Sequence, residues 1–136
     1  EPLLDRMDIC VEMDRSPGGD KKCRGKASAE IRRQVQRARE IQTRRYRDEK
    51  ITRNSQLTGR LLKKYCRLGK AEQRCFEDLR EQLGLSARGA ERMLRVARTR
   101  ADLEQSGEIQ EVHLLQASLY KSVNRKYWGM EAAYER

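Results

Sequence analysis

Apolar residues recur at helical spacing along most of the chain, and the most asymmetric stretch lies between Gly84 and Leu103. One arc of that helix would carry the apolar residues Ala90, Met93, Leu94, Ala97 and Ala101, and the opposite arc the arginines Arg88, Arg92, Arg95 and Arg98. Gly84 suits the left-handed residue that closes a preceding helix, and Ser86 is a favourable N-cap. The pattern predicts a helix that begins at Ser86, with one core-facing side and one cationic side.

The same periodicity predicts further helices on both sides of this one. The first begins with Ser28 as its cap and runs to about Arg47, with Ile31, Val35, Ala38 and Ile41 as its apolar side. A short helix over 57–65, a longer one over 70–83 and a final one over 110–121 complete the set. Residues 48–56 are polar, and we expect a loop there. Apolar faces on every helix favour a compact, all-α helical bundle.

The opening of the chain has a different pattern. Ile9, Val11 and Met13 alternate, which predicts a strand within residues 3–13. Since no other β pattern is present, we expect an orphan strand whose partners lie upstream. Residues 14–26 are rich in Pro, Gly and charge and predict a loop. This loop resembles a phosphate-binding loop, but Asp20 and Ala27 stand where that motif requires Gly and Ser or Thr, so we do not assign one.

Composition narrows the possible partners and sites. The 136 residues are 38% charged and 37% hydrophobic, with a formal net charge of +10. They suit one domain with a modest core and an anionic partner such as DNA.

No apolar run approaches the roughly 20 residues that a membrane span needs, so no membrane partner is expected. Cys10, Cys23, Cys66 and Cys75 show no zinc spacing and fit reduced thiols of a cytoplasmic protein. We expect no metal site, and we expect His113 to pack against its neighbours.

Arg88 is the unusual member of the cationic side. A cation in the first turn of a helix faces the positive end of the helix dipole. An anion held by the exposed N–H groups and the guanidinium would compensate, and a nucleotide phosphate is one candidate. The alternative is a solvated surface arginine that costs a few tenths of a kcal/mol. The helix alone leaves both interpretations open.

Several stretches carry a resemblance to a known family, namely PLLDRMDICVE, SAEIRRQVQRARE, LSARGAERMLRVARTRADL and EVHLLQASLY. They resemble the C-terminal part of the magnesium-chelatase-like AAA+ ATPases of the ComM/YifB group, over about residues 2–125. The resemblance implies that Arg88 is the sensor-2 residue at the start of the lid helix. It also implies that Arg6 is an arginine finger that acts on a neighbouring subunit's nucleotide. Whether Arg88 acts in cis or in trans stays open.

The resemblance also implies a domain organisation. Residues 1–26 would be the end of the ATPase core, with the arginine-finger turn, the last strand and a loop, and we expect them to be flexible. Residues 27–121 would form the helical lid domain and residues 122–136 a C-terminal tail. The full-length protein is expected to bind ATP and Mg²⁺, to assemble into a ring, expected to be a hexamer, and to remodel DNA or drive branch migration. Without Walker A and Walker B motifs, this chain is expected to be inactive and free of cofactors by itself.

A hypothesis from a different class is an autonomous basic helical module that binds DNA without sequence preference. Arg92, Arg95 and Arg98 would then contact phosphates. A groove-facing side made almost wholly of arginine argues against the reading of bases. The many arginines of the first helix predict either a solvated face or a DNA surface. A helical protein-binding adaptor is a third possibility, although no exposed apolar stripe indicates it.

Overall fold

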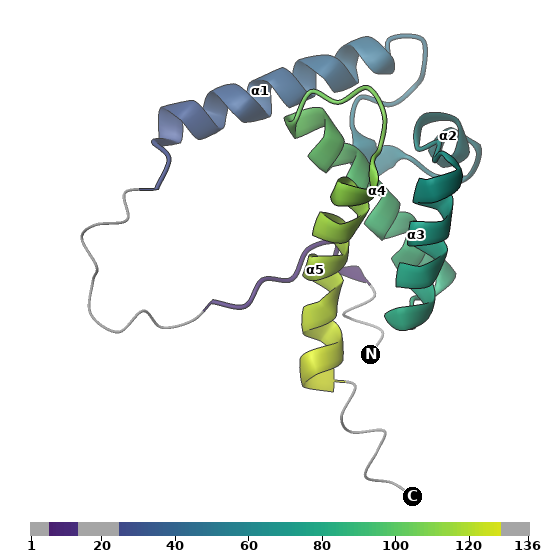
Figure 1. The fold of residues 1–136 in the computed structure, drawn as a ribbon. Helices are drawn as coiled ribbons and strands as arrows, with labels where there is room; N and C mark the ends of the chain where they lie inside the picture. Colours follow the sequence, from purple (N-terminus) through teal and green to yellow (C-terminus); the bar gives the residue numbers. More distant parts are fainter. Residues whose placement is uncertain (1–5, 14–24, 129–136) are drawn as a thin grey trace, which may run out of the picture.

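The computed structural model describes residues 6–13 and 25–128, with side chains as far as Lys121, and the regular secondary structure of this part is helical (Figure 1). Its elements are α1 (Ser28–Arg45), the 3-10 turn η2 (Asn54–Gln56), α2 (Gly59–Tyr65), α3 (Lys70–Gln82), α4 (Ala87–Leu103) and α5 (Glu111–Trp128). The described residues contain no strand. The predicted all-α bundle is therefore confirmed, and α5 continues seven residues past its predicted end at Lys121.

Helix α4 is the centre of the bundle and packs against α5, α1 and η2. On its predicted core side, Met93, Ala97 and Ala101 are fully buried and Leu94 is half-buried. The alanines let α5 approach closely through Ala117, and Met93 fills the remaining space. Truncating a buried side chain of this size typically costs about 2–5 kcal/mol. The predicted apolar side of this helix is confirmed.

The junction between α3 and α4 forms as its residue types predict. Gly84 has φ +59°, in the left-handed region that a side chain disfavours. The N–H of Leu85 donates to the carbonyl of Arg80 and that of Gly84 to the carbonyl of Glu81, which is the Schellman pattern. The hydroxyl of Ser86 then accepts the N–H of Gly89 at 3.1 Å. Only four residues, 83–86, thus separate α3 from α4, which fixes the direction of α4.

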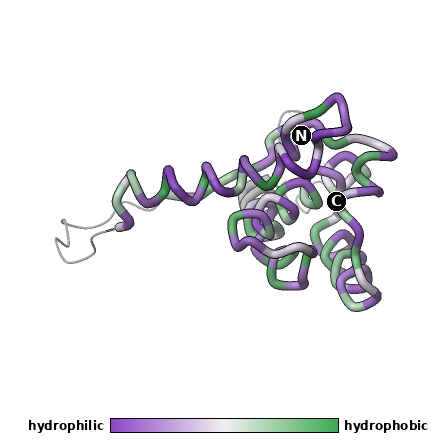
Figure 2. The backbone as a smooth tube through the Cα atoms, turned by 90° about the horizontal axis from the view of Figure 1, so that it is seen from above, coloured by the Kyte–Doolittle hydropathy of each residue, from purple (hydrophilic) through white to green (hydrophobic). Residues whose placement is uncertain are grey.

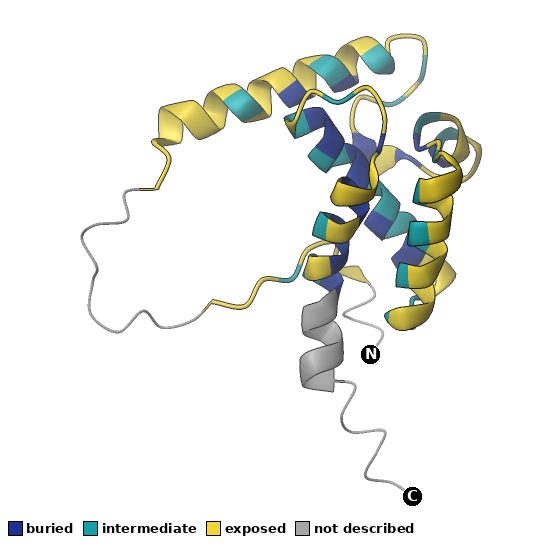
Figure 3. Cartoon of the chain, viewed as in Figure 1, coloured by how far each residue is buried: buried dark blue, intermediate teal, exposed yellow. Residues whose placement is uncertain are grey.

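Only the second half of α1 belongs to the core. Ala38 and Gln42 are buried, but Ile31 and Val35 are exposed, because the first half of the helix extends beyond the body (Figures 2 and 3). The predicted apolar side is therefore wrong for that half. The cap was also wrong, since the N-cap is Ala27 and makes no side-chain hydrogen bond. Helical spacing shows which residues share a side, but not how far the partner surface reaches.

Two segments outside the long helices make specific contacts with the bundle. Residues 48–56 contain η2, whose Asn54 is almost fully buried. Residues 6–13, where an orphan strand was predicted, form an extended segment that is not a strand, and the N–H of Cys10 donates to the carbonyl of Tyr120 on α5 at 3.3 Å. The rest of the segments assigned to the ATPase core, 1–5 and 14–24, lie outside the described residues, as does the tail beyond 128.

Candidate functional site

The exposed N-terminal turn of α4 carries Arg88. Ser86 caps the N–H of Gly89, whereas Ala87 and Arg88 are exposed and belong to the first turn, whose N–H groups have no acceptor within the helix. Among the described residues, no hydrogen bond or ion pair holds the Arg88 side chain. A guanidinium and adjacent N–H groups therefore face solvent together, which is an arrangement that suits an anion.

Arg92 lies one turn further on and connects α4 to the N-terminal segment. Its guanidinium donates to the main-chain carbonyl of Arg6 at 2.7 Å and to the Asp8 carboxylate at 2.7 Å. Arg6 is itself exposed. Since one helical turn rises about 5.4 Å, the main chain at Arg6 lies near the same side of α4 that carries Arg88. The Arg6 main chain is thus held by the arginine one turn from Arg88, while the side chains of Arg6 and Arg88 make no hydrogen bond or ion pair with each other among the described residues.

Arg95 and Arg98 are occupied inside the bundle. Arg95 donates to the carbonyl of Leu57 at 2.7 Å and forms an ion pair with Glu91. The Arg98 side chain is only 3% exposed, and its guanidinium binds Asp102 and the carbonyls of the α4–α5 loop. Those carbonyls belong to Ser106 and Gly107, at 2.7 and 3.0 Å. The sequence predicted an exposed cationic side throughout, but at Arg98 that side is buried under the loop.

Asp102 is the centre of a buried polar network that the helical pattern does not predict. Its carboxylate is fully buried and accepts hydrogen bonds from Arg98, Arg45 and the amide of Asn54, the last at 2.8 Å. The Asn54 oxygen accepts the hydroxyl of Tyr46 at 2.6 Å. Every buried polar side-chain atom in the described part has a partner. The network joins α1, η2 and α4, so it holds the docked half of α1 in place.

The pKa values of this network follow from burial. Burial raises the pKa of Tyr46 to about 12 by disfavouring the phenolate. Burial also lowers the pKa of Arg98, against the attraction of Asp102. For Arg45 burial acts in the same downward direction, but the hydrogen bond and charge of Asp102 outweigh it and raise its pKa. Both arginines remain charged at neutral pH, so two cations share one buried carboxylate.

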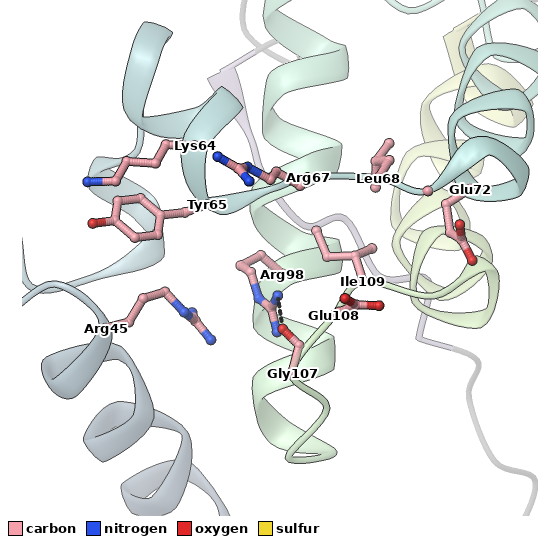
Figure 4. A pocket seen from close by; sticks show the side chains of 11 residues that line it. Arg45, Lys64, Tyr65, Arg67, Leu68, Glu72, Arg98, Gly107, Glu108 and Ile109 are labelled. Atoms are coloured by element: carbon pink, nitrogen blue, oxygen red, sulfur yellow. Dashed lines mark hydrogen bonds between the residues drawn. The ribbon is translucent and has the colours of Figure 1, made fainter.

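A pocket of about 440 Å³ borders this network between α2, the start of α3 and the α4–α5 loop (Figure 4). Arg45 and Arg98 lie in its wall, and Arg67 and Lys64 are also part of its lining. The wall arginines are bound to Asp102 and to main-chain carbonyls, and Lys64 is paired with Glu49 at 2.7 Å. Three of these four cations already have partners, so the pocket is mainly the boundary of a structural network. Arg67 is exposed and has no hydrogen bond or ion pair among the described residues.

The described residues offer no alternative chemistry around cysteine or histidine. They contain no cluster of three potential metal ligands, and Cys10, Cys66 and Cys75 are free thiols. Burial raises the pKa of Cys66 to about 11, which keeps it protonated. His113 is buried, accepts the N–H of Gln110 at its Nδ1 and bonds Glu104 through Nε2 at 3.1 Å. It packs within the helical domain, as predicted.

Comparison with known proteins matches residues 25–121 to the family described as magnesium chelatase, subunit ChlI C-terminal. The uncharacterized protein YifB of Salmonella typhimurium is 39% identical over 127 residues. The competence protein ComM of Haemophilus influenzae is 35% identical over 127 residues. Each match covers 91% of this chain and 24% of the relative, so the chain spans about a quarter of the length of these curated relatives. The matched range contains helices α1 to α4 and the part of α5 that ends at Lys121. None of the described helices is long and apolar enough to span a bilayer.

Proposed function

Because the chain belongs to the family of the magnesium chelatase subunit ChlI C-terminal domain, and corresponds to the C-terminal part of ComM and YifB, we propose that it is the lid of an AAA+ ATPase. In this role the domain senses the bound nucleotide and contributes to the assembly of a ring. The proposal rests on the exposure and the lack of bound partners of the Arg88 side chain among the described residues. Arg88 is the arginine of the cationic side of α4 without a partner among the described residues, and it stands where the helix offers free N–H groups.

The residues fit a nucleotide phosphate. Arg88 supplies charge and directional donors, and the first turn of α4 adds N–H groups and the positive end of the helix dipole. ATP with Mg²⁺ supplies the transferable phosphoryl group, and preorganised cations stabilise the charge that develops on it. The described residues contain no cluster of three potential metal ligands.

The proximity of the Arg6 main chain to α4 supports an assignment in trans for both arginines. Arg92 binds the carbonyl of Arg6 and lies one turn from Arg88. If Arg6 acts on the nucleotide of a neighbouring subunit, then Arg88 acts at the same interface. One nucleotide would be contacted across each subunit boundary, and such contacts repeated around a closed ring, which we propose to be a hexamer, couple the subunits.

DNA is the proposed substrate of the full-length protein, and one relative is named a competence protein. Arg92, Arg95 and Arg98, the phosphate contacts considered from sequence, are engaged within the chain. The exposed arginines of α1 are better placed for a salt-dependent contact without sequence preference, and they are Arg32, Arg33, Arg37, Arg39 and Arg44. This surface also supports the second candidate function, a basic module that binds DNA by itself.

The proposed function is tested by Arg88→Ala in the full-length protein. We expect ATP turnover to fall about 100-fold, as for the loss of one preorganised donor to a transition state, with thermal unfolding unchanged. Arg74→Ala on the exposed side of α3 is the matched control and should retain full turnover. If Arg88→Ala hydrolyses ATP like the parent, Arg88 is a solvated surface arginine and the sensor assignment is wrong.

A further inference from the structure

We propose that Arg92 and Lys121 fasten the main chain around Arg6 to the helical domain, so that α4 and α5 position the Arg6 side chain. Arg92 is then a positioning residue, which acts through Arg6 and makes no contact with the nucleotide. The inference rests on the proposed function of Arg6. It also gives Arg92 a different role from the phosphate contact considered from its position on the cationic side of α4.

The contacts fall on four residues of a short segment, 6, 7, 8 and 10. Arg92 binds the carbonyl of Arg6 and the carboxylate of Asp8, both at 2.7 Å. Lys121, which is 5% exposed, donates to the carbonyl of Met7 at 2.6 Å. The N–H of Cys10 donates to the carbonyl of Tyr120 at 3.3 Å. Helices α4 and α5 therefore hold residues 6, 7, 8 and 10, which restricts the main chain from Arg6 onward.

Apolar burial does not explain this docking. The large apolar side chains of the segment face solvent, with exposures of 43% for Met7, 54% for Ile9, 62% for Val11 and 85% for Met13. Hydrogen bonds from charged donors are stronger than those between neutral groups. The two cations therefore provide the main attachment, and most of their acceptors are main-chain carbonyls, which any residue at positions 6 and 7 would supply.

The attachment links the two arginines of the proposed site. Arg92 and Arg88 are one turn apart on the same rigid helix. When the lid moves with the nucleotide state, Arg6 moves together with Arg88, and their separation stays nearly constant. Substitution of Arg92 would leave Arg6 and Arg88 in the protein, but Arg6 would no longer be held at a fixed position relative to Arg88.

The fastening is tested first by backbone ¹⁵N relaxation on the 136-residue chain, which reports order on the picosecond to nanosecond scale. In the parent chain, residues 6–10 should have heteronuclear NOE values close to those of α4. Arg92→Ala should lower these values toward those of a free terminus, and Lys121→Met should lower them further when combined with it. Arg88→Ala, one turn away and without a contact to the segment, is the matched control. Unchanged values in the double variant would overturn the proposal.

The positioning role is tested by ATP turnover in the full-length protein. Arg92→Ala should lower kcat at least 10-fold with little change in KM, and adding it to Arg6→Ala should cause no further loss. Arg92→Lys, which keeps a charged donor, should recover part of kcat. Full turnover of Arg92→Ala beside an inactive Arg6→Ala would refute the positioning role and leave the proposed function intact. Full turnover of Arg6→Ala would instead refute the assigned role of Arg6.

Discussion

The two ends of α4 use the same residue type in opposite ways. Arg88 in the first turn is exposed and without a partner among the described residues, whereas Arg98 near the other end is buried against Asp102 and the α4–α5 loop. The two arginines lie on the same arc of the helix. The difference arises because a loop covers one end of that arc and leaves the other bare. A cationic stripe can therefore combine structural and functional residues, and the covering segment decides which is which.

The buried end should respond most strongly to loss of its anion. Asp102→Ala leaves Arg45 and Arg98 without their shared carboxylate. We expect a loss of about 4 kcal/mol in the free energy of unfolding, as for removal of one partner of a buried ion pair. Urea denaturation followed by circular dichroism measures it. A loss below about 1 kcal/mol would mean that water compensates the two arginines and that this end resembles the exposed one.

Removal of the buried cation should have the next largest effect. Arg98→Ala leaves the carbonyls of Ser106 and Gly107 and part of the Asp102 carboxylate without donors. We expect a loss of about 3 kcal/mol from these unsatisfied groups and from the cavity. The same denaturation experiment checks it, with Arg74→Ala as an exposed control.

The stability of the exposed N-terminal end of α4 depends on its N-cap residue, Ser86. Ser86→Ala removes the hydroxyl that accepts the N–H of Gly89, and loss of such a cap typically costs about 1 kcal/mol. Ser86→Asp, which keeps an acceptor, should retain most of the stability. An unchanged stability of Ser86→Ala would mean that the neighbouring Schellman turn, and not the hydroxyl, sets the start of α4.

The smallest effect on stability is expected at Arg88. Arg88→Ala removes an exposed cation that the helix dipole disfavours and introduces a better helix former. The free energy of unfolding should change by less than about 0.5 kcal/mol. If Arg88→Ala destabilised the fold as Arg98→Ala does, the contrast between the two ends of α4 would be lost.

The sequence predicts those parts of the fold that depend on local chemistry. Ser86, Gly84 and the spacing of Met93 and Ala97 place α4 to within a residue, because caps and helical periodicity act over a few positions. The position of Asp102 four residues after Arg98 could have indicated an ion pair. Nothing local indicates that the loop residue Asn54 is buried, because its partners on α4, Thr99 and Asp102, are far away in the sequence.

The features of the candidate site also separate into those that the local sequence predicts and those that depend on long-range contacts. The exposed N-terminal turn with Arg88 follows from local helix rules, while its role comes from the family resemblance. The contact between Arg92 and the Arg6 carbonyl joins positions 86 residues apart, and no periodicity reports such a distance. Helical spacing alone assigned Arg92, Arg95 and Arg98 a common surface, whereas their partners differ.

The half-docked state of α1 implies a gradient of local stability along a single helix. Its first ten residues rise about 15 Å, carry the exposed side chains of Ile31 and Val35, and depend on their own hydrogen bonds. A helical segment of that length is marginal in water, whereas the end at Arg45 is bound by the Asp102 network. Amide exchange should therefore slow progressively from Ser28 to Arg45, and α1 should fray from its free end without unfolding the domain.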